Sequence, residues 1–146
     1  MQLQELLSQL RKSRLAVLAT VSPESKPESA LVGFAVSDSF ELIFDTLETT
    51  RKSNNLRLNP QIALVIGWDD YTTVQYEGIA DEPAGAELEN LKEIYFQVFP
   101  DGPLRQTWPG ISYFRVRPNW IRYSCYNDPV RIVEFRAEDL VRSKII

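Results

Sequence analysis

The sequence predicts a mainly β domain, a β-barrel of about six antiparallel strands with inserted helices. Three observations support this fold class. Short apolar segments of high strand propensity recur along the 146 residues, with turn-forming residues between them. Helical patterns interrupt this series without a regular strand–helix alternation, which favours a barrel over a parallel sheet. The length suits a single domain over residues 1–146, and we find no internal repeat or linker.

The strands are expected where apolar segments lie between turn signals. The segment 62–68 (IALVIGW) is apolar throughout, which predicts a strand buried on both faces. The long segment 111–127 changes its apolar phase near Tyr113 and contains Pro118, so we expect a bulge or bend. Its arginines alternate with apolar residues, which favours a solvent face or salt bridges across a dimer over a positive rim toward an anionic substrate. They are Arg115, Arg117 and Arg122. The expected strands cover residues 15–21, 29–36, 41–46, 62–68, 73–80, 111–127 and 130–135.

The helices are expected where apolar residues recur at helical spacing or where capping residues frame a short segment. Four leucines form one apolar stripe near the N-terminus. The segment that starts at Thr49 opens with hydroxyl residues suited to an N-cap and stops at Asn59 and Pro60. The expected helices cover residues 3–10, 49–59 and 88–99, with a closing helical turn at 137–140.

Composition excludes several classes of protein. A formal charge of −4 argues against a nucleic-acid partner, which needs a basic face. No apolar run reaches 18 residues, so we expect no membrane span, and the polar N-terminus does not resemble a secretory signal. The one cysteine, Cys125, cannot form an internal disulfide, which fits a cytoplasmic protein.

The chain contains no histidine. The commonest general base, and the commonest protein ligand of zinc and haem, are therefore missing from it. A Ser-His-Asp or Cys-His hydrolase is excluded on composition, and we expect no metal site. Any difficult chemistry is expected to come from a bound cofactor.

A candidate anion site lies at Thr49, Thr50, Arg51 and Lys52, where a strand gives way to a helix. The first N–H groups of a helix lack intrahelical partners and carry the positive end of its dipole, so they suit a phosphate. Hydroxyl, guanidinium and ammonium groups add further donors. The alternative is an ordinary solvated helix start with threonine caps.

The segment 44–68 resembles the flavin-phosphate segment of the pyridoxamine 5′-phosphate oxidase-like family. In that family, an aromatic residue and a Thr end a strand, and a hydroxyl residue precedes Arg-Lys. A short helix, an Asn-Pro pair and an apolar strand ending in Trp follow. TVQYEGIADE and FRVRPNWIRY resemble later strands of the family, so the similarity covers residues 14–135. The matching residues are Phe44, Thr46, Thr50, Arg51, Lys52, Asn59, Pro60 and Trp68.

The resemblance implies an FMN-binding split barrel that forms a homodimer, with the cofactor near the subunit interface. By position, Thr50, Arg51 and Lys52 would bind the phosphate group of FMN. Asp45 and Thr46 would lie along the ribityl chain or the flavin edge.

The residue that contacts the flavin ring is less clearly defined by the resemblance. Gln75 would form a hydrogen bond to the ring, and Thr73 would take that place if the alignment shifted by one residue. The alternative for Gln75 is a polar residue on the outward face of an alternating strand.

The chain departs from the family where the oxidases bind their substrate. They carry a His-containing basic motif near the C-terminus, where this chain has NDPVRIVEF. Ser124 stands where they have a Trp beside the flavin, and Ala30 and Ala35 stand at basic positions of the second strand. The sequence therefore argues against oxidation of pyridoxamine phosphate.

The leading interpretation is a flavin-dependent oxidoreductase that acts on an unidentified small molecule, and no residue stands out as catalytic. A deazaflavin coenzyme, which has a similar phosphate and ring, is the alternative within the enzyme class. Outside that class, the sequence is also compatible with a non-enzymatic flavin carrier or stress protein, and with a barrel that binds nothing.

Overall fold

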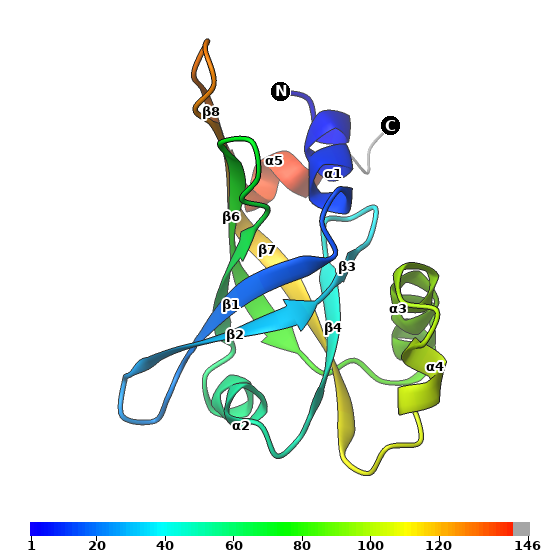
Figure 1. The fold of residues 1–146 in the computed structure, drawn as a ribbon. Coiled ribbons are helices and arrows are strands. Elements are labelled where there is room, and N and C mark those ends of the chain that lie inside the picture. Colours follow the sequence, from blue (N-terminus) through cyan, green and yellow to red (C-terminus); the bar gives the residue numbers. More distant parts are fainter. Residues whose placement is uncertain (142–146) are drawn as a thin grey trace.

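The computed structural model describes residues 1–141 and shows one curled antiparallel sheet with helices at its ends and on one side (Figure 1). The sheet holds eight strands in the order β2-β1-β5-β6-β7-β4-β3, with β8 paired to β7. The predicted fold class is confirmed, with more strands than expected. The strands are β1 (Leu15–Val21), β2 (Pro27–Gly33), β3 (Ala35–Val36), β4 (Leu42–Leu47), β5 (Gln61–Ile66), β6 (Thr72–Asp81), β7 (Ile111–Cys125) and β8 (Arg131–Arg136).

The order of the strands explains why the sheet curls. Its two end strands, β2 and β3, are consecutive in the chain and only Phe34 separates them. The Cα atoms of Gly33 and Ala35 are two peptide units apart and therefore lie within about 7.6 Å of each other. The two ends of the sheet must therefore approach each other. The expected strand over residues 29–36 is therefore two strands, and the sheet becomes a half-barrel with an apolar interior.

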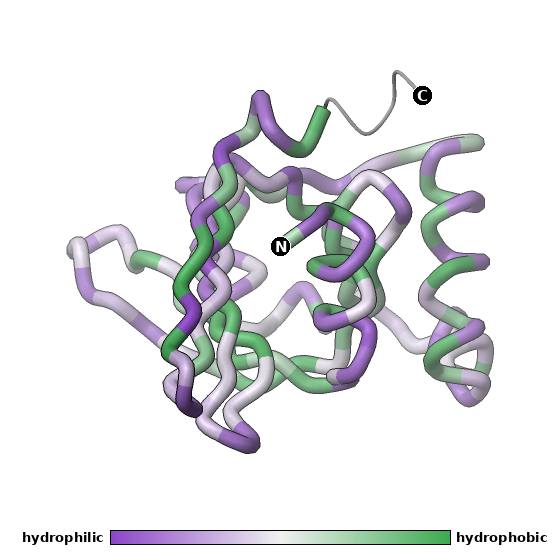
Figure 2. Tube along the Cα trace, turned by 90° about the horizontal axis from the view of Figure 1, so that it is seen from above, coloured by the Kyte–Doolittle hydropathy of each residue, from purple (hydrophilic) through white to green (hydrophobic). Residues whose placement is uncertain are grey.

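The helices cover different parts of this half-barrel. The buried leucines of α1 belong to the main core, and Figure 2 shows this helix over the opening of the half-barrel. Helix α2 lies at the end of the half-barrel opposite α1, and α3 and α4 lie to one side of the sheet (Figure 1). None of the helices within residues 1–141 is long and apolar enough to cross a membrane. The helices are α1 (Leu3–Arg11), α2 (Arg51–Leu58), α3 (Gly85–Val98), α4 (Gly102–Arg105) and α5 (Ala137–Val141).

Strand β4 separates two cores. Leu42 and Phe44 point into the half-barrel, whereas Ile43 packs with Leu91 and Tyr95 of α3 on the other side. Successive side chains of a strand point to opposite faces, so consecutive residues of β4 serve different cores. This alternation also decides where the polar residues at the end of β4 point.

The prediction that segment 62–68 is buried on both faces is wrong for the single chain. In β5, Ile62, Leu64 and Ile66 are buried, while Ala63 and Val65 are exposed. Strand β5 lies between β1 and β6, and none of the described helices covers its second face. The outward side chains of β1, β5 and β6, together with Leu31 at the edge, are called the outer face below.

The long strand β7 contains the expected irregularity. Gly78 of β6 pairs with Pro118 and Glu77 pairs with Trp120, so Asn119 is an extra residue in β7. Pro118 cannot donate a ladder hydrogen bond, which explains why the register shifts there. The bulge is confirmed, at the proline rather than at Tyr113.

The expectation that Arg115 lies on a solvent face or in a dimer salt bridge is wrong. Its side chain is buried and donates to both carboxylate oxygens of Asp81, at 2.9 and 2.6 Å. Glu87 of α3 lies 3.6 Å from the same guanidinium. Helix α3 covers this part of β7, so Arg115 is paired inside the chain.

Candidate anion-binding site

A pocket of about 380 Å³ opens at the N-terminus of α2 and is called the α2 pocket below. Three segments line it: Thr20 of β1, residues 28–30 of β2 and residues 49–52. Within residues 1–141, no hydrogen bond uses the backbone N–H of Arg51 or Lys52. The pocket therefore combines free helix N–H groups with two cationic side chains, as an anion site requires.

Thr50 is the N-cap residue of α2, as predicted. Its Oγ1 accepts a long hydrogen bond from the Ser53 N–H, at 3.4 Å, and donates to the Leu47 carbonyl, at 2.8 Å. The Oγ1 of Thr46 lies 3.1 Å from the same hydroxyl. Thr50 thus fixes the start of the helix, and Thr46 supports Thr50 from the buried side of β4.

The two cations of the α2 pocket differ in their surroundings. The side chain of Arg51 is 73% exposed and pairs with Glu28 at 2.9 Å. Burial lowers the pKa of Lys52, and the negative charge of Asp45 partly opposes this shift. An anion beside Lys52 would favour its charged form, so bound phosphate and this ammonium group would stabilise each other.

Glu28 is the residue of this site that the sequence interpretation missed. Its side chain is 17% exposed, and its Oε1 accepts a hydrogen bond of 2.8 Å from Asn55 Nδ2. The same Asn55 amide donates to Thr20 Oγ1 at 3.0 Å, and both Asn55 and Thr20 are buried. The available signal was the alternation of β2, which puts residue 28 on the same face as residue 30.

Asp45 lies apart from the α2 pocket. It points to the side of β4 that faces α3, where the Tyr95 hydroxyl donates to Oδ1 at 3.0 Å. Arg105 donates to Oδ2 at 2.9 Å. Burial raises the pKa of Tyr95, and the nearby Asp45 raises it further, so the phenol remains a donor. Asp45 thereby fastens α3 and α4 to the sheet, and its contact with a cofactor remains a prediction.

Gln75 also lies away from the α2 pocket, on the outer face. A hollow of about 250 Å³ there brings it close to Val17, Val65 and Trp120. Thr73, the alternative contact to the flavin ring, points to the same face, and its buried Oγ1 has no hydrogen-bond partner among the described residues. Thr46, Thr50, Arg51 and Lys52 are therefore brought together within one chain, and Gln75 is not.

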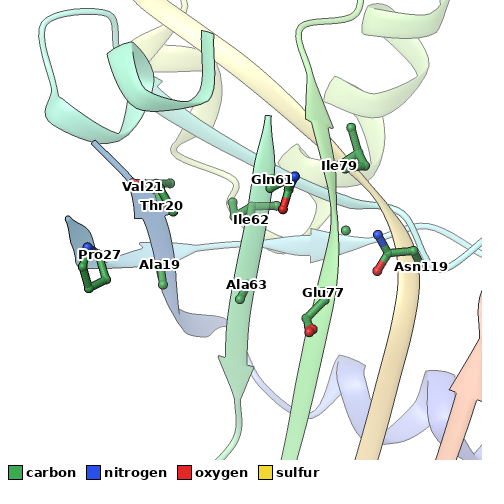
Figure 3. Close-up of a pocket in the computed structure, with 11 residues that line it drawn as sticks. Ala19, Thr20, Val21, Pro27, Gln61, Ile62, Ala63, Glu77, Ile79 and Asn119 are labelled. Carbon is green, nitrogen blue, oxygen red and sulfur yellow. The ribbon is translucent and has the colours of Figure 1, made fainter. Parts of the chain in front are cut away.

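A second and larger hollow, of about 580 Å³, crosses the outer face (Figure 3). Ala19 and Ala63 leave it shallow, and the polar side chains of Gln61, Glu77 and Asn119 lie along it (Figure 3). It contains a carboxylate and neither Lys nor Arg. A phosphate needs compensating positive charge. The α2 pocket is smaller than this hollow, but it contains two cationic side chains and therefore fits an anion better.

Comparison with known proteins shows to which family the chain belongs. The family model described as pyridoxamine 5′-phosphate oxidase matches residues 3–125. The chain belongs to the pyridoxamine 5′-phosphate oxidase-like family. This match extends from α1 to the end of β7 and includes the α2 pocket and the outer face.

One relative of the chain is considerably longer than the chain itself. A pyridoxine/pyridoxamine 5′-phosphate oxidase from Rubrobacter xylanophilus is 31% identical over 93 residues, which are 63% of this chain and 41% of that protein. The chain thus spans less than half of this relative.

Solved structures share the fold at low sequence identity. A heme binding protein from Mycobacterium smegmatis has a TM-score of 0.83 and 17% identity, over 97% of this chain and 61% of that one. General stress protein 26 from Bacillus anthracis has a TM-score of 0.69 and 22% identity, over 91% and 98% of the two chains. The same fold therefore occurs in a protein named for heme binding and in a protein named for the stress response.

The residues of the α2 pocket fit the phosphate group of a flavin in most respects. Thr49, Arg51 and Lys52 line one space, and the backbone N–H groups of Arg51 and Lys52 have no described hydrogen bond. Glu28 is the exception, because its carboxylate lines the same space and occupies Arg51. The described residues contain no group of three or more His, Cys, Asp or Glu side chains that could hold a metal ion.

Proposed function

We propose that the protein binds FMN, with the phosphate group at the N-terminus of α2 and the flavin ring at the interface of a homodimer. Thr50, Arg51 and Lys52 would hold the phosphate, and Thr46 would support Thr50. The observation that carries this proposal is the meeting of both cations and the capped helix start in one pocket, in the segment that resembles the flavin-phosphate segment of the family.

The role proposed for the bound FMN is hydride transfer to or from a small molecule, since the flavin supplies redox chemistry that amino-acid side chains lack. The protein would supply the position of the cofactor and hydrogen bonds to its ring. Gln75 or Thr73 would make such a hydrogen bond from the outer face. A deazaflavin reductase and a non-catalytic flavin carrier would use the same pocket, and the experiment below distinguishes them.

The absorption spectrum of the purified protein tests this proposal. We expect added FMN to remain with the protein through gel filtration and to give flavin absorption in the protein peak. Bleaching of that absorption by NADH or NADPH without oxygen would support a reductase, whereas no bleaching would favour a carrier. A protein peak without flavin would contradict the proposal, and the same experiment with a deazaflavin coenzyme or haem would follow.

The outer face supports the homodimer. Leu15, Val17, Leu31 and Val65 each expose between 38% and 59% of their surface there. None of the helices in residues 1–141 covers this part of the sheet, and contiguous exposed apolar groups mark contact sites. A second copy on this face would bury the remaining side of β5, which explains why residues 62–66 are apolar on both faces.

A lysine in this face is expected to separate the two copies. In Val65→Lys, dimerisation would bury a charge, so we expect the dimer dissociation constant to rise at least about a hundredfold. Val65 is exposed in the single chain, and the variant should therefore fold. Light scattering after gel filtration measures the mass.

The matched control is Leu104→Lys, which places the same charge on an exposed leucine of α4. It should remain dimeric. A monomeric wild-type protein, or a Val65→Lys variant as dimeric as the control, would contradict the assignment of this face.

A further inference from the structure

We propose that Glu28 is a specificity-determining residue of the α2 pocket, which weakens the binding of doubly charged phosphate groups relative to singly charged or neutral ligands. The proposal rests on the proposed function, because it assumes that a phosphate enters this pocket. An anion site requires positive charge, but Glu28 carries a negative charge, and its carboxylate repels the ligand that Arg51 and Lys52 attract.

The carboxylate of Glu28 is fixed in place. Asn55 Nδ2 donates to one of its oxygens at 2.8 Å, and Arg51 contacts the other at 2.9 Å. Asn55 is 2% exposed and is itself held by the buried hydroxyl of Thr20. Rotation of Glu28 out of the pocket would leave the buried Asn55 amide without one of its acceptors, which is costly.

Arg51 is free to move by comparison. Its side chain is 73% exposed, and ion pairs with an exposed partner contribute little to stability. An incoming phosphate can therefore take Arg51 from Glu28 at small cost. The negative charge of Glu28 stays beside the ligand when this happens.

The balance of charges in the pocket determines which ligands Glu28 disfavours. Arg51 and Lys52 contribute two positive charges, and Glu28 cancels one of them. A phosphomonoester carries a charge of about −2 above pH 7, whereas a phosphodiester carries about −1. Repulsion by a fixed carboxylate grows with the charge of the ligand, so Glu28 acts most strongly against the monoester.

Three flavins that differ in charge test this role: riboflavin, riboflavin 4′,5′-cyclic phosphate and FMN. Their dissociation constants are measured by fluorescence titration at pH 8 for the wild type and Glu28→Gln. We expect this substitution to strengthen FMN binding about tenfold, to strengthen binding of the cyclic phosphate less, and to leave riboflavin unchanged. Gln can still accept from Asn55, so the variant should fold.

The matched control is Glu24→Gln, which removes the same charge from an exposed position of the β1–β2 turn. It should change none of the three affinities. Equal strengthening of all three flavins by Glu28→Gln, or no change in FMN binding, would overturn the role of Glu28 while leaving the proposed function intact.

A separate measurement covers the case in which the wild type binds no flavin, which would refute the proposed function. Inorganic phosphate is then titrated while the backbone amide signals of Arg51 and Lys52 are followed by NMR. The signals should shift at a lower phosphate concentration in Glu28→Gln than in the wild type. Equal concentrations, or no shift in either protein, would overturn the role of Glu28.

Discussion

Replacement of both Arg51 and Lys52 by Ala is expected to weaken FMN binding at least about a hundredfold, because two charge-assisted contacts to a phosphate are lost. The loss is increased by Glu28, whose carboxylate would face the phosphate with no cation beside it. Riboflavin has no phosphate and should bind the variant and the wild type equally. Fluorescence titration of both flavins measures the difference.

The control for this variant removes two positive charges elsewhere. Lys12 and Arg14 are exposed, belong to no described ion pair and precede the first residue of β1, whereas Thr20 near the other end of β1 lines the α2 pocket. Double replacement of Lys12 and Arg14 by Ala matches the change in net charge. It should leave FMN binding within about twofold, since exposed distant charges are screened by salt. An Arg51/Lys52 variant that binds FMN like this control would refute the α2 pocket as the phosphate site.

Gly78→Ala is expected to destabilise the fold by about 3 kcal/mol, and so to lower the melting temperature by about 10 °C. A Cβ atom at Gly78 would lie 2.3 Å from the carbonyl oxygen of Arg117 and 2.8 Å from Val116 Cγ1. The obstacle is backbone at the β6–β7 bulge, which cannot rotate away as a side chain can. Thermal and urea unfolding measure the loss.

Gly85→Ala is the matched control, because no atom lies within 4 Å of the position of its Cβ. Its backbone has a φ of 63°, so Ala there should cost about 1 kcal/mol. Gly78→Ala should be clearly the less stable of the two. Equal stability of the two variants would contradict the prediction that the close approach of β6 and β7 at the bulge restricts residue 78 to glycine.

Local patterns were enough to find most elements of the fold. The expected helix over residues 49–59 is α2, with Thr50 as its cap, because capping is a contact between residues three apart. Pro118 indicated the bulge in β7, since proline removes a ladder hydrogen bond wherever it stands. The anion-site candidates Arg51 and Lys52 followed from the same local reasoning.

Local patterns failed where a residue had two possible environments. Segment 62–68 contains apolar residues on both faces, and the sequence does not say whether a helix or a second chain covers the outer one. Arg115 alternates with apolar residues like an exposed side chain, yet α3 covers it and Asp81 and Glu87 neutralise it. In both cases the answer depends on an element distant in sequence.

The amino-acid sequence by itself determined most of the strands and helices, the capped start of α2 and the two cations beside it. These features depend on hydrogen bonds and side-chain periods within a few residues. The tertiary structure alone decided that Glu28 joins the α2 pocket, through a hydrogen bond from Asn55, 27 residues away. It also brought Arg105 to Asp45, which lies 60 residues away in the sequence. The curling of the sheet sets both outcomes, because it decides which strand faces meet and which charges come into contact.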